Sequence, residues 1–319
     1  LGLVLMAVLP DILPSPFVGI LIAVVLYAIG SGLIEVLVSP IVEACPIKAK
    51  KAAMSLLHSF YCWGHLFVVL ASTLFFTLFG IDKWRILACV WAIVPLLNGF
   101  YFAKVPILTL TQEGEEVPVK KLFSSKVFLL FILIMVCAGA SEQGMSQWAS
   151  AFAEAGLNVS KTVGDLAGPS FFAITMGVSR VIYSGISERV DLSKYMTACA
   201  VLCIFAYAVA SFSNSAVVSL VGCAVCGFSV GVMWPGAFSL ASESIPKGGT
   251  AMFAFLALAG DFGCSFGPTV VGFATDSMNG DIKKGVFAAV VFPILLIVSI
   301  VLMNKIKKQT PKLDKNCVK

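Results

Sequence analysis

The chain has 319 residues, of which 59% are hydrophobic and only 12% are charged. A soluble domain carries about 25% charged residues, so this composition excludes a sizeable aqueous domain. The net charge of +5 does not indicate nucleic acid as a partner, because the basic residues gather in short connections between apolar segments.

In chain order, nine apolar segments are each long enough to cross a bilayer as a helix, since about 20 apolar residues cover a hydrocarbon core of roughly 30 Å. Residues 1–9 are apolar but too short to span, and we expect them to be the end of a helix whose start is missing. The sequence therefore predicts an all-α integral membrane protein. The nine predicted spans are 17–41, 52–80, 82–103, 126–153, 166–188, 195–212, 215–241, 249–275 and 285–304.

The longest polar interruption separates three complete spans and the first short segment from six later spans. Transporters commonly consist of two helical bundles of equal size, and on that plan the first bundle lacks two helices and part of a third. The expected organisation is an N-terminal bundle over 1–103, a cytoplasmic linker over 104–125, a C-terminal six-helix bundle over 126–306 and a basic cytoplasmic tail over 307–319.

The lysines and arginines orient the predicted spans. If the connection 45–52 is cytoplasmic and the sides alternate, sixteen of the 22 basic residues lie inside, five lie outside and Arg180 falls within a span. An excess of Lys and Arg in cytoplasmic loops is the positive-inside rule. We therefore expect a multi-pass protein of the plasma membrane, for example a bacterial inner membrane, with a cytoplasmic C-terminus.

The ten cysteines lie almost entirely within the apolar spans. Cys223 and Cys226 form a CxxC pair, but a zinc or redox site needs matching ligands elsewhere, so we expect small packing residues there. No metal and no cofactor are expected. We do not expect an enzyme either, because no GxSxG elbow or phosphate-binding glycine loop occurs in a suitable context.

A short loop that begins at the end of the span 166–188 resembles a signature of the major facilitator superfamily. Its Gly185 precedes the acid–Arg pair Glu188 and Arg189, and further charged residues follow up to Lys194. Glu replaces the more usual Asp, and a second glycine is missing. In that family the loop pairs charges across helix ends and holds one gating state, so the resemblance implies gating; a simple topology anchor is the alternative.

Three further stretches resemble sugar porters of the fucose/proton symporter type. Residues 30–40, with Glu35 in mid-helix, resemble that group's fourth helix. Residues 55–60, which include His58, resemble the opening of its fifth helix, and residues 267–276 resemble the end of its eleventh. The resemblance implies two six-helix bundles around a central cavity that opens alternately to each side, with this chain starting within the third helix.

Three carboxylates stand out because they lie away from the ends of the predicted spans: Glu35, Glu142 and Asp261. A charge at the centre of a membrane helix costs about 2.5–3.5 kcal/mol on insertion scales, so each needs an explanation. A carboxyl in an apolar environment can bind and release protons near neutral pH, as a proton-coupled porter requires. We predict proton coupling at these residues, led by Glu35, where the resembled group has its functional acid; a carboxyl that fixes helix packing is the alternative.

The span 126–153 carries polar side chains four residues apart, and residues four apart share a helix face. Because lipid cannot satisfy amides, we expect this hydrophilic stripe to face other helices or a wet cavity. Amides and an indole suit a sugar, since they offer hydrogen bonds to hydroxyls and a flat wall under the ring. His58 in the span 52–80 and Trp234, which precedes Pro235, add a hydrogen-bonding group and an aromatic ring. The alternative is that the polar residues of the stripe form hydrogen bonds between helices. The predicted substrate-binding residues are His58, Gln143, Gln147, Trp148 and Trp234.

A charged side chain within a span needs a partner. Arg180 lies towards the inner end of its span, where Glu188 or Glu243 would neutralise it. We therefore predict a gating residue rather than a ligand.

The favoured interpretation is a secondary active transporter that moves a small polar solute, with a sugar as one candidate, by proton coupling and alternating access. A drug or metabolite exporter on the same fold is the first alternative. A non-transporting membrane sensor, or an inactive truncated remnant, is the second. The expected partners are the solute, protons and the lipid bilayer, and we expect a monomer.

Overall fold

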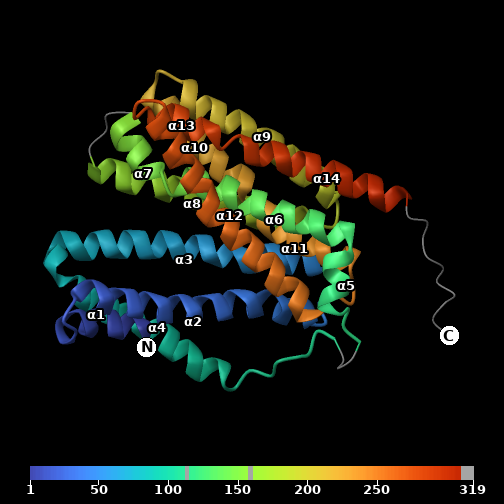
Figure 1. Cartoon of the computed structure of the whole chain (residues 1–319), viewed down its shortest axis with the longest axis horizontal. Coiled ribbons are helices and arrows are strands. Elements are labelled where there is room, and N and C mark those ends of the chain that lie inside the picture. Colours follow the sequence, from blue (N-terminus) through green and yellow to red (C-terminus); the bar gives the residue numbers. More distant parts are fainter. Residues whose placement is uncertain (112–114, 157–160, 310–319) are drawn as a thin grey trace. The chain divides into compact units, whose positions relative to one another are not determined.

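The computed structural model describes residues 1–111, 115–156 and 161–309, and over these residues the chain forms helices and no strands (Figure 1). The elements are α1 (Gly2–Ile12), α2 (Pro16–Ala44), α3 (Lys50–Phe79), η1 (Ile81–Lys83), α4 (Trp84–Phe102), α5 (Val119–Ser124), α6 (Lys126–Ser146), α7 (Ala149–Ala151), η2 (Phe152–Gly156), α8 (Lys161–Ile186), α9 (Leu192–Phe212), α10 (Ala216–Val230), α11 (Met233–Ser244), α12 (Gly249–Ser277), α13 (Ile282–Ala288) and α14 (Val291–Gln309).

The nine predicted spans are confirmed: the described part of the chain has nine helical segments that are long and apolar enough to cross a membrane. Some of them are interrupted. The span Lys126–Glu154 is α6 continued by α7 and the π-helical turn η2, and the span Ala216–Ser244 is α10 followed by α11. The first short segment forms α1, an apolar helix of 11 residues.

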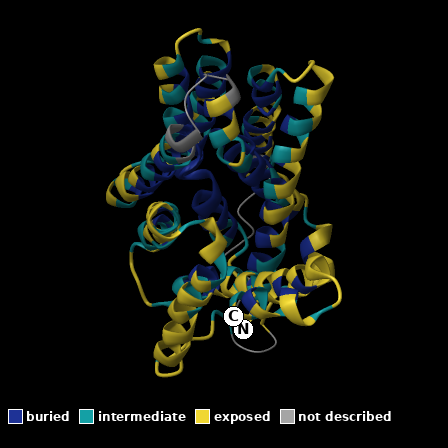
Figure 2. Cartoon of the chain, turned by 90° about the vertical axis from the view of Figure 1, so that its left-hand side faces the viewer, coloured by how far each residue is buried: buried dark blue, intermediate teal, exposed yellow. Residues whose placement is uncertain are grey.

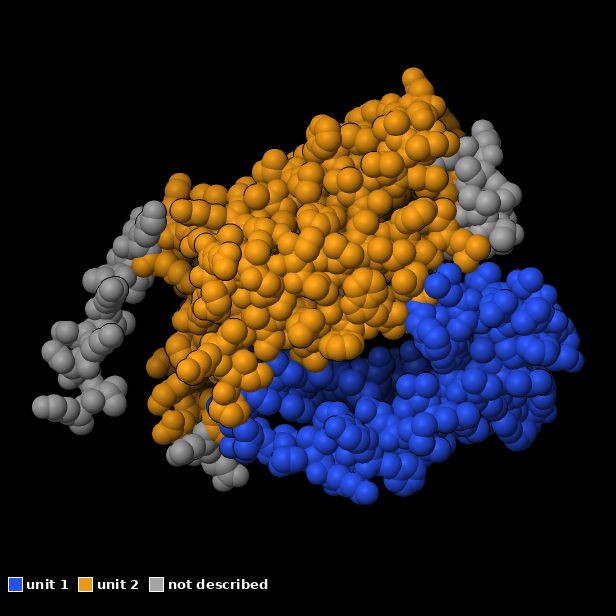
Figure 3. Space-filling view, turned by 180° about the vertical axis from the view of Figure 1, so that it is seen from behind, with its two compact units in different colours: residues 1–45, 67–110 blue, residues 46–66, 111–319 orange. Residues whose placement is uncertain are grey.

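The chain forms two compact units (Figure 3). Unit 1 contains Leu1–Cys45 and Phe67–Leu110, and unit 2 contains Pro46–Leu66 and Thr111–Lys319. Unit 1 ends at Leu110, and Thr111 begins the second part of unit 2. The first half of α3 belongs to unit 2, whereas its second half belongs to unit 1.

In unit 1, α1 packs along α2 and α4. The approach to α2 is close, since a Cβ on Gly19 would lie 2.7 Å from the carbonyl carbon of Leu9. Asp11 in α1 forms an ion pair with Arg85 in α4. Most large apolar side chains of these helices are exposed (Figure 2), which suits contact with lipid.

In unit 2, α6 and α12 lie side by side (Figure 1). Glycines line their contact: a Cβ on Gly139 would lie 2.3 Å from the carbonyl oxygen of Gly260, and one on Gly263 would lie 2.1 Å from that of Val136. Small residues let membrane helices approach this closely. The glycines of α12 therefore set the distance between these two helices.

The helices α8 and α10 approach in a similar way. A Cβ on Gly227 would lie 2.4 Å from the carbonyl oxygen of Phe172, and the hydroxyl of Thr175 donates a hydrogen bond to the carbonyl of Ala224 at 2.6 Å. Buried residues are numerous in α6, α9, α10, α11 and α12 of unit 2. This core holds the polar contacts described next.

The expected cytoplasmic linker is partly structured. Its last part forms α5, where Leu122 is buried. Before α5, the backbone N–H of Val117 donates to the carbonyl of Lys247 at 2.8 Å, which attaches the linker to the loop between α11 and α12. Residues 112–114 of the linker and 310–319 of the expected basic tail lie outside the described residues.

Candidate functional site

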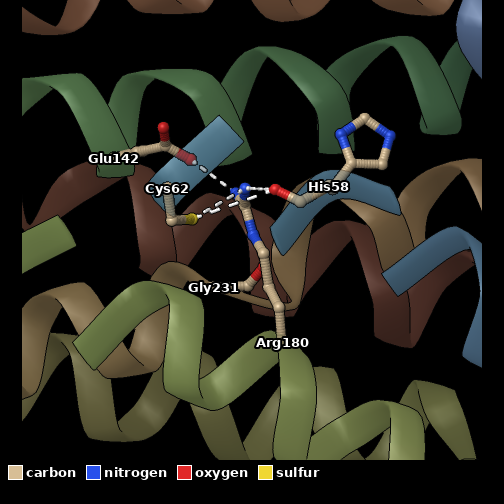
Figure 4. A network of polar contacts seen from close by, with 5 residues as sticks. All are labelled: His58, Cys62, Glu142, Arg180 and Gly231. Carbon is tan, nitrogen blue, oxygen red and sulfur yellow. Dashed lines mark hydrogen bonds and ion pairs between the residues drawn. The ribbon is translucent and has the colours of Figure 1, made fainter. Parts of the chain in front are cut away.

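A buried arginine lies at the centre of a polar network in unit 2 (Figure 4). Arg180 lies on α8, about 9 Å along the axis before the helix ends at Ile186. Only 2% of its surface is exposed. A charge buried to this extent needs a counter-charge and hydrogen bonds, and Arg180 has both.

The counter-charge is Glu142 on α6. Its Oε2 lies 3.3 Å from a terminal guanidinium nitrogen of Arg180, and the residue is 6% exposed. The expectation that Glu188 or Glu243 neutralises this arginine is wrong: Glu188 is exposed, and Glu243 pairs with Lys51 at 2.7 Å. Long helical side chains point back towards the helix N-terminus, which directs the guanidinium away from the end of α8.

Three further groups accept hydrogen bonds from the guanidinium. Its Nε donates to the carbonyl of Gly231 at 2.7 Å. A terminal nitrogen donates to the carbonyl of His58 at 2.7 Å and to the Sγ of Cys62 at 3.3 Å. The centre of the Tyr61 ring lies 6.0 Å from the guanidinium carbon, a distance at which cation–π attraction operates.

The carbonyl of Gly231 is available because of the break between α10 and α11. Proline has no N–H, so Pro235 cannot supply the bond that the residue four positions later normally gives to a helical carbonyl. Gly231 also lies close to α8, since a Cβ there would be 2.9 Å from the carbonyl oxygen of Met176. A side chain at this position would push the acceptor away from Arg180.

The first half of α3 packs against α8 around the same arginine. The hydroxyl of Ser55 donates to the backbone carbonyl of Arg180 at 2.7 Å. A Cβ on Gly177 would lie 3.1 Å from the Cβ of Cys62 and 3.1 Å from the Trp63 ring, so this glycine permits the approach. Arg180 therefore connects α3, α6, α8 and the junction of α10 with α11.

The network includes His58 through its backbone, while its imidazole turns away from the guanidinium (Figure 4). That ring stacks on Phe238 at 5.8 Å between centroids. Trp234 meets the same phenyl ring edge-on at 6.2 Å, and a Cβ on Gly260 would lie 2.2 Å from its indole. Two of the predicted substrate-binding residues thus lie against one aromatic side chain.

The hydrophilic stripe predicted for the span of α6 is interrupted, because the regular helix ends within it. Gln143 is half-buried and Gln147 is exposed. The indole N–H of Trp148 donates to the carbonyl of Pro268 at 3.0 Å, and this bond connects the end of α6 to α12. The indole N–H is therefore already used within the protein.

The other two predicted proton-coupling residues do not take part in these contacts. Glu35 is half-buried on α2, in unit 1. Asp261 is exposed on α12 next to Phe262, which is exposed as well. Within the part of the chain that the structure describes, Asp261 has no ion-pair partner. Of the three carboxylates, Glu142 is thus the one that joins the buried network.

The predicted gating-loop residues Gly185, Glu188 and Arg189 are exposed where α8 ends. In the same loop, the carboxylate of Asp191 accepts a hydrogen bond from the backbone N–H of Lys194 at 2.8 Å and caps α9. None of the three joins the contacts of the buried arginine described above.

Sequence reasoning missed Cys62, Gly231 and Phe238 as neighbours of the site. Two signals were present: Cys62 lies four residues after His58 on one face of α3, and Pro235 marks the carbonyl four positions before it as available. Phe238 gave no signal, because a phenylalanine in an apolar span is ordinary.

The described arrangement can exchange a proton at a carboxylate and hydrogen-bond through a guanidinium. Among the residues that the structure describes, no group of three or more His, Cys, Asp or Glu side chains could hold a metal ion.

A sequence profile of the Major Facilitator Superfamily (MFS) matches residues 1–268. The chain is similar to a crystal structure of an MFS transporter, FucP, in the outward conformation, with a TM-score of 0.74 and 14% identity over 95% of this chain and 81% of that chain. A structure of the E. coli fucose:proton symporter FucP matches with the same values. At this identity the likeness shows the fold. No curated protein sequence matches the chain at a significant level.

Proposed function

Because this chain belongs to the Major Facilitator Superfamily, we propose that it is a proton-coupled secondary transporter of a small polar solute, with a sugar as the favoured class. The family and the fold are those of transporters and not of enzymes. One of the similar structures is that of a fucose:proton symporter. That likeness concerns the fold, so the choice of sugar and proton rests on the residues of this chain.

The observation that carries the proposal is the buried ion pair of Glu142 and Arg180. Ionisable groups within spans are rare and typically mark substrate or proton paths. A buried ion pair gives little net stability, because an apolar pair of similar volume is often as stable or more so. Function is therefore the better reason for keeping this pair in the membrane.

Each remaining residue has a role that its chemistry supports. The amide of Gln143 and the imidazole of His58 would hydrogen-bond hydroxyl groups, and Trp234 would give an apolar wall. The proposed proton-coupling residues are Glu35, Glu142 and Asp261; the substrate-binding residues are His58, Gln143, Gln147, Trp148 and Trp234; the gating residues are Arg180, Gly185, Glu188 and Arg189.

One observation favours a second candidate, an exporter of apolar drugs or metabolites. The rings of His58, Trp234 and Phe253 all lie against Phe238. Such a cluster would suit an apolar cargo better than a sugar. Proton movement stimulated by the solute, measured in vesicles of known orientation, distinguishes uptake from export.

The proposed setting is the plasma membrane, with a cytoplasmic C-terminus and a monomeric protein. The excess of basic residues on one side supports this orientation. The proposed organisation is still two helical bundles around the linker 104–125, with the basic tail 307–319 inside.

The change Glu35→Gln tests proton coupling. We expect it to abolish uphill uptake driven by a pH gradient, because an amide cannot bind a proton, while exchange of labelled for unlabelled solute continues. The measurement uses proteoliposomes and a panel of radiolabelled hexoses and deoxyhexoses.

A matched control is Asp82→Asn, which removes a carboxylate from the exposed turn η1 of the same unit. It should leave both uphill uptake and exchange unchanged. Uphill uptake by Glu35→Gln at the wild-type level would remove Glu35 from the coupling mechanism.

A further inference from the structure

The helix α3 is one continuous helix, Lys50–Phe79, and its two halves belong to different compact units. Its first half, residues 50–66, contacts α8 through hydrogen bonds with Arg180 and through Cys62 and Trp63, which pack against Gly177. The hydroxyl of Ser55 donates to the backbone carbonyl of Arg180. The guanidinium in turn donates to His58 and to Cys62. A movement of this guanidinium would therefore break two of the polar contacts that hold the first half of α3.

The position of the guanidinium depends on Glu142. A guanidinium is a planar group whose five N–H donors have fixed directions. One terminal nitrogen of Arg180 faces the carboxylate, and the other faces the acceptors on α3. The carboxylate, together with the carbonyl of Gly231 that accepts from Nε, thus holds the plane in the orientation that allows the bonds to α3.

We propose that Glu142, by binding and releasing a proton, controls whether Arg180 holds the first half of α3 against α8. The proposal deepens the proposed function and rests on it, because it assigns one coupling proton to a defined contact. In it, Arg180 is a positioning residue rather than a substrate ligand.

The proton step is simple. A proton from water binds one carboxylate oxygen of Glu142, which becomes a neutral acid, and it leaves again by the reverse path. The guanidinium then lacks its counter-charge while it is still buried, so it gains by turning towards water or another anion. That turn breaks its hydrogen bonds to His58 and Cys62.

The surroundings leave Arg180 as the permanent charge that responds to this proton. The groups on the other packed elements are phenols, thiols and an imidazole, which are not permanently charged. The titratable groups that face this region are His58, Tyr61 and Cys62 from α3, Arg180 from α8, Tyr207 from α9 and Cys264 from α12.

Linkage makes the effect reciprocal. If a proton on Glu142 loosens α3, then any event that loosens α3 must strengthen proton binding by the same factor. The site would therefore take up a proton when this half of the helix leaves α8, and release it when the helix returns.

Hydrogen exchange tests the proposal without a known solute. Amide exchange of residues 50–66 is measured in the wild-type protein in lipid nanodiscs, and in Glu142→Gln, which mimics the neutral acid. We expect exchange about tenfold faster or more in the variant, because a buried charge has lost its partner. After correction for intrinsic rates, wild-type exchange should rise from pH 8 to pH 5, and exchange in the variant should not.

The matched control is Asp276→Asn, which removes an exposed carboxylate from α12 of the same unit. It should exchange like the wild type. Equal rates in wild type and Glu142→Gln, or an equal acceleration by Asp276→Asn, would overturn the proposal.

A double variant checks that the effect passes through the arginine. Arg180→Lys keeps the charge but loses the fork, so residues 50–66 should exchange faster at every pH. Adding Glu142→Gln should then change little, and a full additional effect would refute control through Arg180. If Arg180→Lys does not fold, amide exchange of residues 50–66 in the wild type between pH 8 and pH 5 still tests the proposal.

The test also separates this proposal from the proposed function. Failure of the exchange prediction with intact proton-driven uptake would reject only the control of α3. A pH-sensitive α3 without any uptake would reject the transporter and keep the contact.

Discussion

Two helix contacts of unit 2 hold their partners in opposite ways. The contact of α6 with α12 is made by small residues, where Gly263 brings one helix against the carbonyl of Val136. The contact of α3 with α8 also uses a glycine, but a buried guanidinium supplies its polar bonds. Apolar packing has no titratable part, whereas an ion pair responds to a single proton. The contact of α6 with α12 is therefore suited to fix the distance between two helices. The contact of α3 with α8 is suited to break and form again when a proton binds and leaves.

The largest expected effect comes from removing one charge of the ion pair. Glu142→Leu leaves the guanidinium of Arg180 buried without a counter-charge, and we expect a loss of about 3–5 kcal/mol in the free energy of unfolding. Denaturant unfolding of the purified protein in detergent measures it.

Its control is the double variant Arg180→Met with Glu142→Leu. It removes both charges and replaces the ion pair with an apolar pair, so most of the lost stability should return. A double variant as unstable as the single one would mean that shape, rather than charge, holds this contact.

The next effect concerns the glycine contact. Gly263→Ala puts a Cβ 2.1 Å from the carbonyl oxygen of Val136, and the backbones must separate. We expect a loss of about 1–3 kcal/mol, with the same value from pH 5 to pH 8 because no titratable group is involved. Thermal unfolding at several pH values measures it.

The control lies on the same helix. A Cβ on Gly272 would lie 3.3 Å from the Trp148 ring, so Gly272→Ala should change stability by less than half as much. A strong pH dependence in Gly263→Ala would erase the difference between the two kinds of contact.

The smallest effect sharpens the contrast between buried and exposed charge. Asp281 caps α13 and pairs with Lys284 at 3.0 Å, and hydrogen bonds from Lys284 lower the pKa of its carboxyl. A lowered pKa gives stability that is present at neutral pH and is lost as the pH falls below about 4.

Asp281→Ala should therefore lower the melting temperature by about 1–2 °C at pH 7. The difference from wild type should shrink as the pH falls below about 4. A larger difference at low pH would have the wrong sign for a carboxylate that acts in its charged form.

The sequence predicted the spans and the rare charges within them, because both depend only on the cost of burying polar groups in lipid. It could not pair those charges. Arg180 and Glu142 are 38 positions apart, and their meeting depends on how α6 and α8 pack. The sequence suggested partners near the end of α8, although an arginine side chain points back along its helix.

The predicted stripe on α6 shows a second limit. Spacing alone placed Gln143, Gln147 and Trp148 near one face, which assumes an unbroken helix. The regular helix ends before Gln147, and the indole bonds to the backbone of α12. The sharing of α3 between two units was also beyond reach, since it depends on contacts of residues 46–66 with distant helices.

The proline after Trp234 affects a residue on another helix. Pro235 has no amide hydrogen, so the carbonyl of Gly231 keeps an unused lone pair, and the Nε of Arg180 binds it. A residue that carries no charge thus helps to solvate the charge of another helix. The missing amide hydrogen of Pro235 leaves a hydrogen-bond acceptor free for Arg180, as an added polar side chain would.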